Sequence, residues 1–152
     1  MEIGIDSFAI NELNNDADNF LWNEQEKKMN IALWIVQILL AIVFLMAGVA
    51  KITQPRENLI EKGMRFVEDF SPNTIRLISV LEVLGAIGIV LPALTGILPW
   101  LTPLAAVGFA LTMVGAALTH LRRGEYPNII ANVILFALAV FVAYGRFVLI
   151  PL

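Results

Sequence analysis

The stretch LISVLEVLGAIGIVLPALTGIL, residues 77–98, contains a single charged side chain, Glu82. A helix crosses the roughly 30 Å hydrocarbon core of a membrane with about 20 apolar residues, so this stretch is long enough to span it. Three further windows are similarly apolar, residues 31–50, 101–121 and 129–147. Glycine and proline occur inside the windows, which membrane helices tolerate. The sequence therefore predicts an all-α fold, an integral membrane four-helix bundle.

The composition agrees with this class and excludes several kinds of chemistry. Of 152 residues, 59% are hydrophobic and 15% are charged, whereas ordinary globular domains have about 25% charged residues. With no cysteine and one histidine, the chain cannot carry out thiol exchange, hold a cysteine-ligated iron–sulfur cluster or attach haem covalently. We expect no metal site and no covalent cofactor, so a redox role would need an organic carrier or another subunit. The net charge of −3 gives no indication of a nucleic-acid partner.

The first 28 residues differ from the rest of the chain because they carry most of the acidic excess. They lack the basic start and apolar stretch of a signal peptide. We expect residues 1–28 to form an acidic, mobile tail and residues 29–152 to form the membrane domain. Met29 could also be the true translation start, which would make the prefix an artefact of the assigned start site.

The connections between the windows indicate how the helices follow one another. Residues 56–70 alternate apolar and charged positions at helical spacing, which predicts a short amphipathic helix at the membrane surface. Ser71 and Pro72 are typical of a helix start. Residues 95–100 are too short for anything but a tight hairpin, and Gly124 ends the third helix.

Positive charges are distributed unevenly between the two ends of the predicted bundle. More basic residues fall on the side of the charged loops (Lys51, Arg56, Lys62, Arg65, Arg76, Arg122 and Arg123) than on the side of the termini (Lys27, Lys28 and Arg146). The positive-inside rule then places the charged loops in the cytoplasm and both termini outside. We expect a multi-pass protein of the cytoplasmic (inner) membrane.

Polar residues from all four predicted helices fall at a similar depth near the charged-loop side. Helix alternation places Lys51, Glu82, His120 and Asn132 there, and Asn128 lies one turn from Asn132 on the same stripe. Ionisable groups are costly in hydrocarbon and usually face a cavity or one another. These five residues are the candidates for ligand binding or proton exchange; catalytic residues stay unknown.

Structural and functional interpretations of these residues both remain open. Lys51 and Glu82 could exchange protons with a ligand or form an ion pair that fixes the bundle. His120 could donate a hydrogen bond to a ligand oxygen or simply bond a carbonyl at headgroup level. Gln37, isolated toward the opposite side, is interpreted as an interhelical contact, and the stripe Gly108, Thr112, Gly115 and Thr119 as a surface for close helix packing.

Several motifs resemble the DoxX and DoxX-like family of small four-helix membrane proteins. They are AGVAK at residues 47–51, FVEDFS at 66–71, LEVLGA at 81–86 followed by Leu91-Pro92, and HLRRGE at 120–125. The similarity covers roughly residues 29–147. It implies a four-helix bundle in the cytoplasmic membrane. Founding members of the family are subunits of a thiosulfate:quinone oxidoreductase, and other relatives are linked to oxidative-stress complexes or to membrane-protein assembly; this chain is more similar to the DoxX-like branch.

Three functions follow as hypotheses from the sequence. The first is an auxiliary subunit of a membrane redox system, not a complete enzyme by itself, with a polar pocket for a small lipophilic ligand such as a quinone and residues 56–70 over that pocket as a lid. The second is a membrane scaffold or assembly factor without ligand chemistry. The third, less favoured, is a small transporter. Expected partners are the lipid bilayer and either a redox subunit or further copies of the chain.

Overall fold

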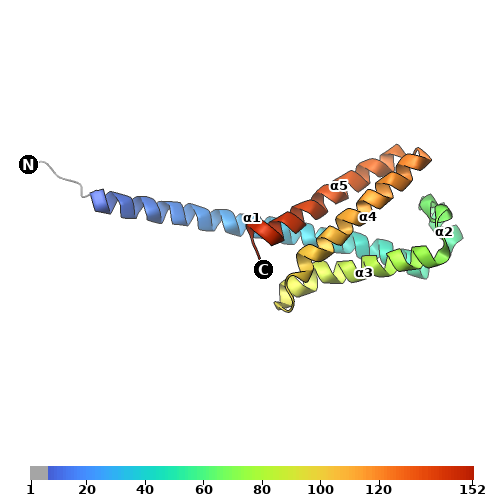
Figure 1. The fold of residues 1–152 in the computed structure, drawn as a ribbon, viewed down its shortest axis with the longest axis horizontal. Coiled ribbons are helices and arrows are strands. Elements are labelled where there is room, and N and C mark those ends of the chain that lie inside the picture. The colour runs from blue at the N-terminus through green and yellow to red at the C-terminus, as the bar shows by residue number, and fades with distance from the viewer. Residues whose placement is uncertain (1–6) are drawn as a thin grey trace, which may run out of the picture. The chain divides into compact units, whose positions relative to one another are not determined.

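The computed structural model describes residues 7–152, with side chains from residue 19 onward. Within that part the chain is mostly helical and has no strand. Its elements in order are α1 (Ser7–Thr53), α2 (Arg56–Glu61), the 3₁₀ helix η1 (Arg65–Asp69), α3 (Pro72–Thr95), α4 (Leu101–Arg123), α5 (Tyr126–Tyr144) and the π-helical turn η2 (Gly145–Leu149) (Figure 1).

Four spans among the described residues are long and apolar enough to cross a membrane: Asn19–Thr53, Pro72–Thr95, Leu101–Arg123 and Tyr126–Leu149. Large apolar side chains on these helices are exposed on the outside of the protein, for example Leu77, Leu81 and Leu84 of α3. Such an outer surface suits lipid and is unsuited to water. The all-α fold with four membrane-spanning helices, predicted from hydropathy, is confirmed.

The N-terminal part of α1 forms a separate unit. The chain divides into the compact units Met1–Ala32 and Leu33–Leu152. In the first unit the described residues are helical, and Phe20 and Trp22 are exposed. Lys27 Nζ lies 3.2 Å from Glu24 on the adjacent turn. Residues 7–28 are thus helix in this structure, while the mobility expected for residues 1–28 stays a prediction, and residues 1–6 lie outside the described part.

The helix ends follow the chemistry of their sequences. Ser71 caps α3 by accepting a hydrogen bond from the backbone N–H of Thr74, and Pro72 occupies the first turn, where a missing N–H has no cost. Gly96 and Gly124 end α3 and α4 with φ values of 71° and 70°, a left-handed conformation that suits glycine. The predicted helix start, hairpin and helix end are all found at these residues.

The predicted amphipathic helix over residues 56–70 is wrong as a single helix. The structure divides it into α2 and η1, because Gly63 adopts a φ of 87° between them. Its apolar face is nevertheless buried: Leu59 and Val67 pack with Ile75 at the start of α3. The segment therefore folds back on the bundle through a turn that a continuous helix would not permit.

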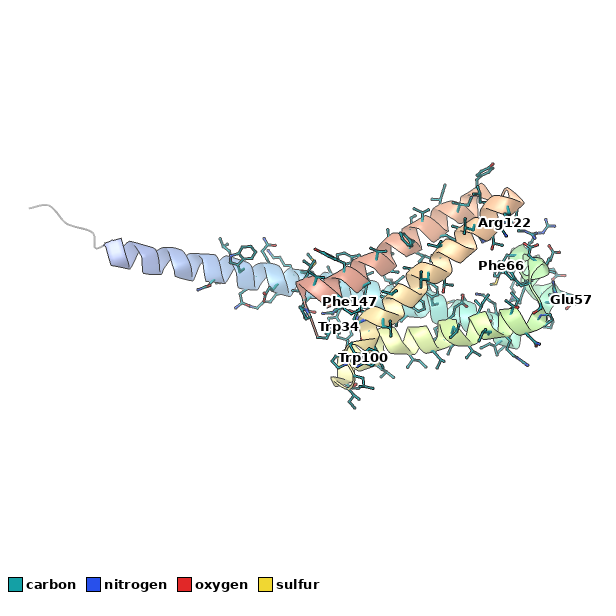
Figure 2. The ribbon with its side chains drawn as sticks, in the orientation of Figure 1. Trp34, Glu57, Phe66, Trp100, Arg122 and Phe147 are labelled. Atoms are coloured by element: carbon teal, nitrogen blue, oxygen red, sulfur yellow. The ribbon has the colours of Figure 1, made fainter. Side chains whose placement is uncertain are left out.

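Within Leu33–Leu152, α5 packs along α4, and this pair diverges from α3 toward the end of the bundle that carries α2 (Figure 1). Between the two ends of the bundle the core is a cluster of buried apolar side chains. Its centre is the stacked pair Phe44 and Phe109, whose ring centroids lie 3.7 Å apart. A Cβ on Gly85 would lie 2.6 Å from the Phe109 ring, so glycine provides the room for this stack. Figure 2 shows Glu57, Phe66 and Arg122 at the α2 end, and Trp34, Trp100 and Phe147 at the opposite end.

Candidate functional site

The structure brings four of the five candidate residues to one cavity at the α2 end. Lys51 from the last turn of α1, Glu82 from α3, His120 from the end of α4 and Asn132 from α5 all line it. Its volume is about 480 Å³, within the usual range of about 300–1,000 Å³ for small-molecule sites. The fifth candidate, Asn128, is not among the residues that line this cavity. Convergence of the four helices, inferred from helix direction alone, is therefore observed in space.

Lys51 and Glu82 form a buried ion pair in the wall of this cavity. Lys51 Nζ lies 2.6 Å from both carboxylate oxygens of Glu82, and the two side chains are only 6% and 5% exposed. Gly48, one turn earlier on α1, permits the close approach, because a Cβ there would lie 2.9 Å from the carbonyl oxygen of Ser79 on α3. Each charge thus has an opposite charge at hydrogen-bond distance, as an apolar environment requires.

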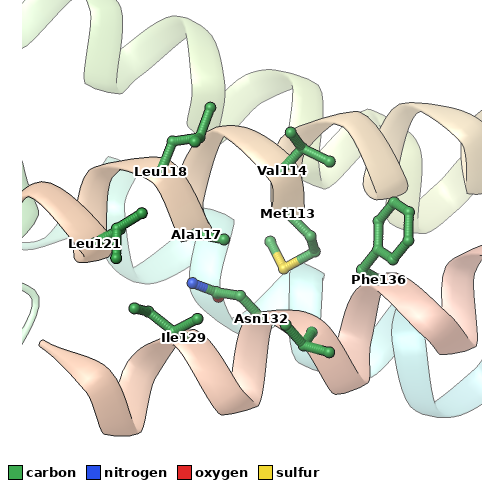
Figure 3. Close-up of a pocket in the computed structure, with 9 residues that line it drawn as sticks. Met113, Val114, Ala117, Leu118, Leu121, Ile129, Asn132 and Phe136 are labelled. Atoms are coloured by element: carbon green, nitrogen blue, oxygen red, sulfur yellow. The ribbon is translucent and has the colours of Figure 1, made fainter.

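Asn132 supplies a buried hydrogen-bond donor that has no acceptor in the described part of the chain. The side chain is 9% exposed, and its Nδ2 makes no hydrogen bond within the described residues. Figure 3 shows the side chain extending from α5 toward α4, opposite Met113 and Ala117. Asn132 lies between the 480 Å³ cavity and a shallower groove of about 250 Å³ that is otherwise lined by apolar residues. A buried amide without a partner costs free energy unless water or a ligand accepts its proton.

His120 belongs to a polar cluster that sequence reasoning did not anticipate. Its Nδ1 lies 2.7 Å from Glu125 Oε2, and Asn128 Nδ2 donates to the same carboxylate oxygen at 3.2 Å. Arg123 Nε donates to the other oxygen, Oε1, at 2.9 Å. The proton on Nδ1 therefore faces Glu125, and Nε2 has no hydrogen-bond partner in the described part of the chain. The sequence left open a bond from His120 to a carbonyl; in the structure its partner is the carboxylate of Glu125.

The turn after α4 explains why Glu125 reaches His120. With Gly124 in the left-handed conformation, the backbone N–H of Glu125 bonds the carbonyl of His120 at 3.0 Å, which brings the two side chains to one side of the turn. The signal for this contact is present in the sequence as a histidine followed four residues later by a helix-ending glycine and then by a carboxylate.

Arg123 also joins α4 to the segment between α1 and α3. Its guanidinium lies 2.7 Å from Asp69 and 3.0 Å from Glu68. From the same segment Met64, Phe66 and Phe70 line the cavity, and the Phe66 ring lies edge-on to His120. In this structure residues 64–70 thus form one wall of the cavity. Whether they move as the expected lid stays a prediction.

Glu125 should make the free energy of unfolding depend on pH between about 2 and 4.5. Hydrogen bonds from Arg123 and then from His120 lower the pKa of Glu125 to about 2, against an ordinary value of 4.5. The unfolded chain therefore binds more protons between these values, so the contribution of Glu125 to stability is complete above pH 4.5 and is lost as the pH falls toward 2. We expect the stability difference between wild type and Glu125→Gln to shrink over this window.

Unfolding in detergent between pH 2 and pH 7 measures this difference. Glu68 and Asp69, which share Arg123 with Glu125, are present in both proteins, so subtraction removes most of their own titration. A difference that stays constant from pH 7 to pH 2 would contradict the low pKa.

At the opposite end of the bundle Gln37 is buried, but it is not isolated as expected. Its Nε2 donates to the carbonyl of Ile89 at 2.8 Å, and its Oε1 accepts from Arg146 Nε at 2.7 Å. Arg146 is 2% exposed, and its guanidinium lies 5.5 Å from the centre of the Trp34 ring. The predicted interhelical role of Gln37 is confirmed. Its second partner is the buried Arg146, a contact that hydropathy does not predict.

The stripe of small residues on α4 does not pack closely against another helix of the described chain. A Cβ on Gly108 or Gly115 would meet no atom within 4 Å. Thr112, Gly115 and Thr119 instead line the cavity. The expected packing role is wrong within this chain, because α4 and α3 diverge here and leave the stripe facing open space.

The fold and site together define a multi-pass helical membrane protein with a cavity between its helices that is mostly apolar and is lined by a few polar residues. The model of the DoxX-like family matches residues 35–142, more than half of the chain, so the protein belongs to the DoxX-like family. The resemblance found from the motifs is thereby confirmed. Neither the curated proteins nor the solved structures gave a significant match. Among the described residues, no group of three or more His, Cys, Asp or Glu side chains is placed to hold a metal ion.

Proposed function

We propose that this protein is an auxiliary subunit of a membrane redox system, and that its 480 Å³ cavity binds the headgroup of a small lipophilic carbonyl compound such as a quinone. The observation that carries the proposal is the Nδ2 of Asn132, a buried donor without an acceptor among the described residues, on a side chain that helps to line a largely apolar cavity. A carbonyl oxygen of the ligand would accept a hydrogen bond from this donor, and the apolar side chains would pack against the quinone ring.

The remaining polar groups suit a ligand whose oxygens gain and lose protons. His120 Nε2 accepts a hydrogen bond when the ring is neutral and donates one when it is charged, while Glu125 fixes the ring through Nδ1. The Lys51 and Glu82 pair supplies a second proton-exchanging group on the opposite wall. The chain lacks cysteine and has one histidine, so electrons would come from a partner subunit, which is why we propose an auxiliary role.

Binding of a short-chain ubiquinone analogue to the purified protein in mild detergent tests the proposal. We expect Asn132→Leu, which removes the amide at similar volume, to weaken binding about tenfold, the effect of one lost hydrogen bond to a buried donor. Glu82→Gln should also weaken binding, because it leaves the Lys51 charge without its counter-ion. Equal affinity in the wild type and both variants would overturn the proposed site.

Thr102→Val is the matched control. Thr102 Oγ1 is also buried without a hydrogen-bond partner among the described residues, but it lies at the start of α4 and does not line the cavity. Its removal should leave the affinity unchanged. A loss as large as that of Asn132→Leu would mean that any buried polar substitution disturbs binding through the fold.

A scaffold or assembly function is the second candidate, favoured by one observation. Both oxygens of Glu82 are engaged by Lys51, so the pair joins α1 to α3 in the absence of any ligand. Under this function Glu82→Gln lowers thermal stability and leaves quinone affinity unchanged, and crosslinking in membranes recovers stable protein partners. Mass spectrometry of the proteins and lipophilic molecules that co-purify after gentle solubilisation separates the two functions directly.

A further inference from the structure

We propose that a second cavity, between the end of α1, α2 and the start of α3, binds the phosphate of an anionic membrane phospholipid. Its volume is about 280 Å³, and Arg56 and Arg76 line it together with Asn73. The proposal is independent of the quinone site, because it rests on different side chains and a different ligand.

The positive charge at this cavity is not compensated by the protein. Neither Arg56 nor Arg76 makes an ion pair or a side-chain hydrogen bond with another residue whose side chain is described. Glu57, the neighbour of Arg56 in sequence, likewise forms no ion pair there. Elsewhere on the same side of the bundle Arg123 is surrounded by carboxylates. Two guanidinium groups at one cavity present a planar set of donors that matches the oxygens of a phosphate.

The start of α3 adds to the attraction for an anion. Pro72 and Asn73, in the first turn of this 24-residue helix, line the cavity beside Arg76. The positive end of the helix dipole therefore faces the same space as the two arginines. Anions are stabilised at such helix starts, and the effect adds to that of fixed positive charges nearby.

The position of the cavity favours a lipid headgroup as the source of the phosphate. The cavity lies where one membrane span ends at Thr53 and the next begins at Pro72, which is the depth of the headgroups. Ile52 lines it and is itself 43% exposed, and Leu77 on the next turn of α3 is 60% exposed. An acyl chain can follow this apolar surface while the phosphate stays between the arginines.

Native mass spectrometry of the full chain with added lipid tests the proposal. The probes are phosphatidylglycerol and phosphatidylcholine with identical acyl chains, since they differ in net charge. We expect wild type to retain phosphatidylglycerol preferentially, and Arg56→Gln/Arg76→Gln to lose about tenfold or more of that retention, a loss that one or two charge-assisted hydrogen bonds would produce. Arg56→Lys/Arg76→Lys should retain an intermediate amount. Lysine keeps the positive charge but lacks the planar guanidinium group, which can donate two parallel hydrogen bonds to a phosphate.

Arg65→Gln/Arg122→Gln is the matched control, because it also removes two positive charges. Both residues are exposed on the same side of the bundle, and neither lines this cavity. If this control loses as much phosphatidylglycerol as Arg56→Gln/Arg76→Gln, the attraction is a general surface effect and the proposed site is wrong. In a second experiment, inorganic phosphate is added at millimolar concentration to compete with the bound lipid. Displacement of the lipid by inorganic phosphate would assign the site to a soluble phosphate and overturn the lipid assignment.

Discussion

Replacing Lys51 by methionine is expected to destabilise the bundle by about 3–5 kcal/mol, the usual cost of removing one partner of a buried ion pair. Glu82 is left 5% exposed, with no other ion pair to a described residue to replace Lys51. Methionine keeps the length of the lysine stem, so the loss is mainly that of the charge. Unfolding by SDS titration in mixed micelles, followed by circular dichroism, measures the change in the free energy of unfolding.

The double variant Lys51→Met/Glu82→Leu separates the pair from the packing around it. Because both charges are removed, we expect most of the lost stability to return. A single variant as stable as wild type would mean that the 2.6 Å contact does not persist in the membrane protein. A double variant as unstable as the single one would assign the loss to packing and not to charge.

Gly48→Ala should destabilise the protein by about 1–3 kcal/mol, because the added Cβ overpacks the contact between α1 and α3. The added Cβ would lie 2.9 Å from the backbone oxygen of Ser79 and 2.9 Å from Val83 Cγ2. A backbone oxygen cannot rotate away as a side chain can, so α1 must move from α3. The same SDS titration measures this loss.

Gly108→Ala is the matched control for this prediction. Its Cβ would meet no atom within 4 Å, so alanine should be neutral there or stabilise α4 by up to about 1 kcal/mol through helix propensity. Equal losses at Gly48 and Gly108 would show that the close contact between α1 and α3 is not the cause.

The spans, the helix ends and the depth of the polar residues were all predictable from the sequence. Each depends on local information: hydropathy over about 20 residues, the capping chemistry of Ser71 and Gly124, and the alternating direction of successive helices. Depth alone was enough to select Lys51, Glu82, His120 and Asn132, because buried polar groups are few in such a chain.

Contacts that depend on how the helices pack could not be predicted in the same way. The pairing of Gln37 with Arg146 joins residues far apart in sequence, and hydropathy places Arg146 at a membrane surface without showing that it is buried. Where α4 diverges from α3, Thr112, Gly115 and Thr119 of the small-residue stripe line a cavity, which the small-residue pattern cannot reveal. Amphipathic spacing likewise does not show where Gly63 interrupts residues 56–70.

The stacked rings of Phe44 and Phe109 have a consequence for permeability. They lie between the polar cluster around Glu82 and the one around Gln37, in a layer where Leu40, Ile89 and Ala106 are fully buried. An ion that crossed the bundle here would have to give up its hydration among these apolar side chains, which offer no hydrogen bonds in return. In this conformation the apolar layer separates the polar side chains around Glu82 from those around Gln37.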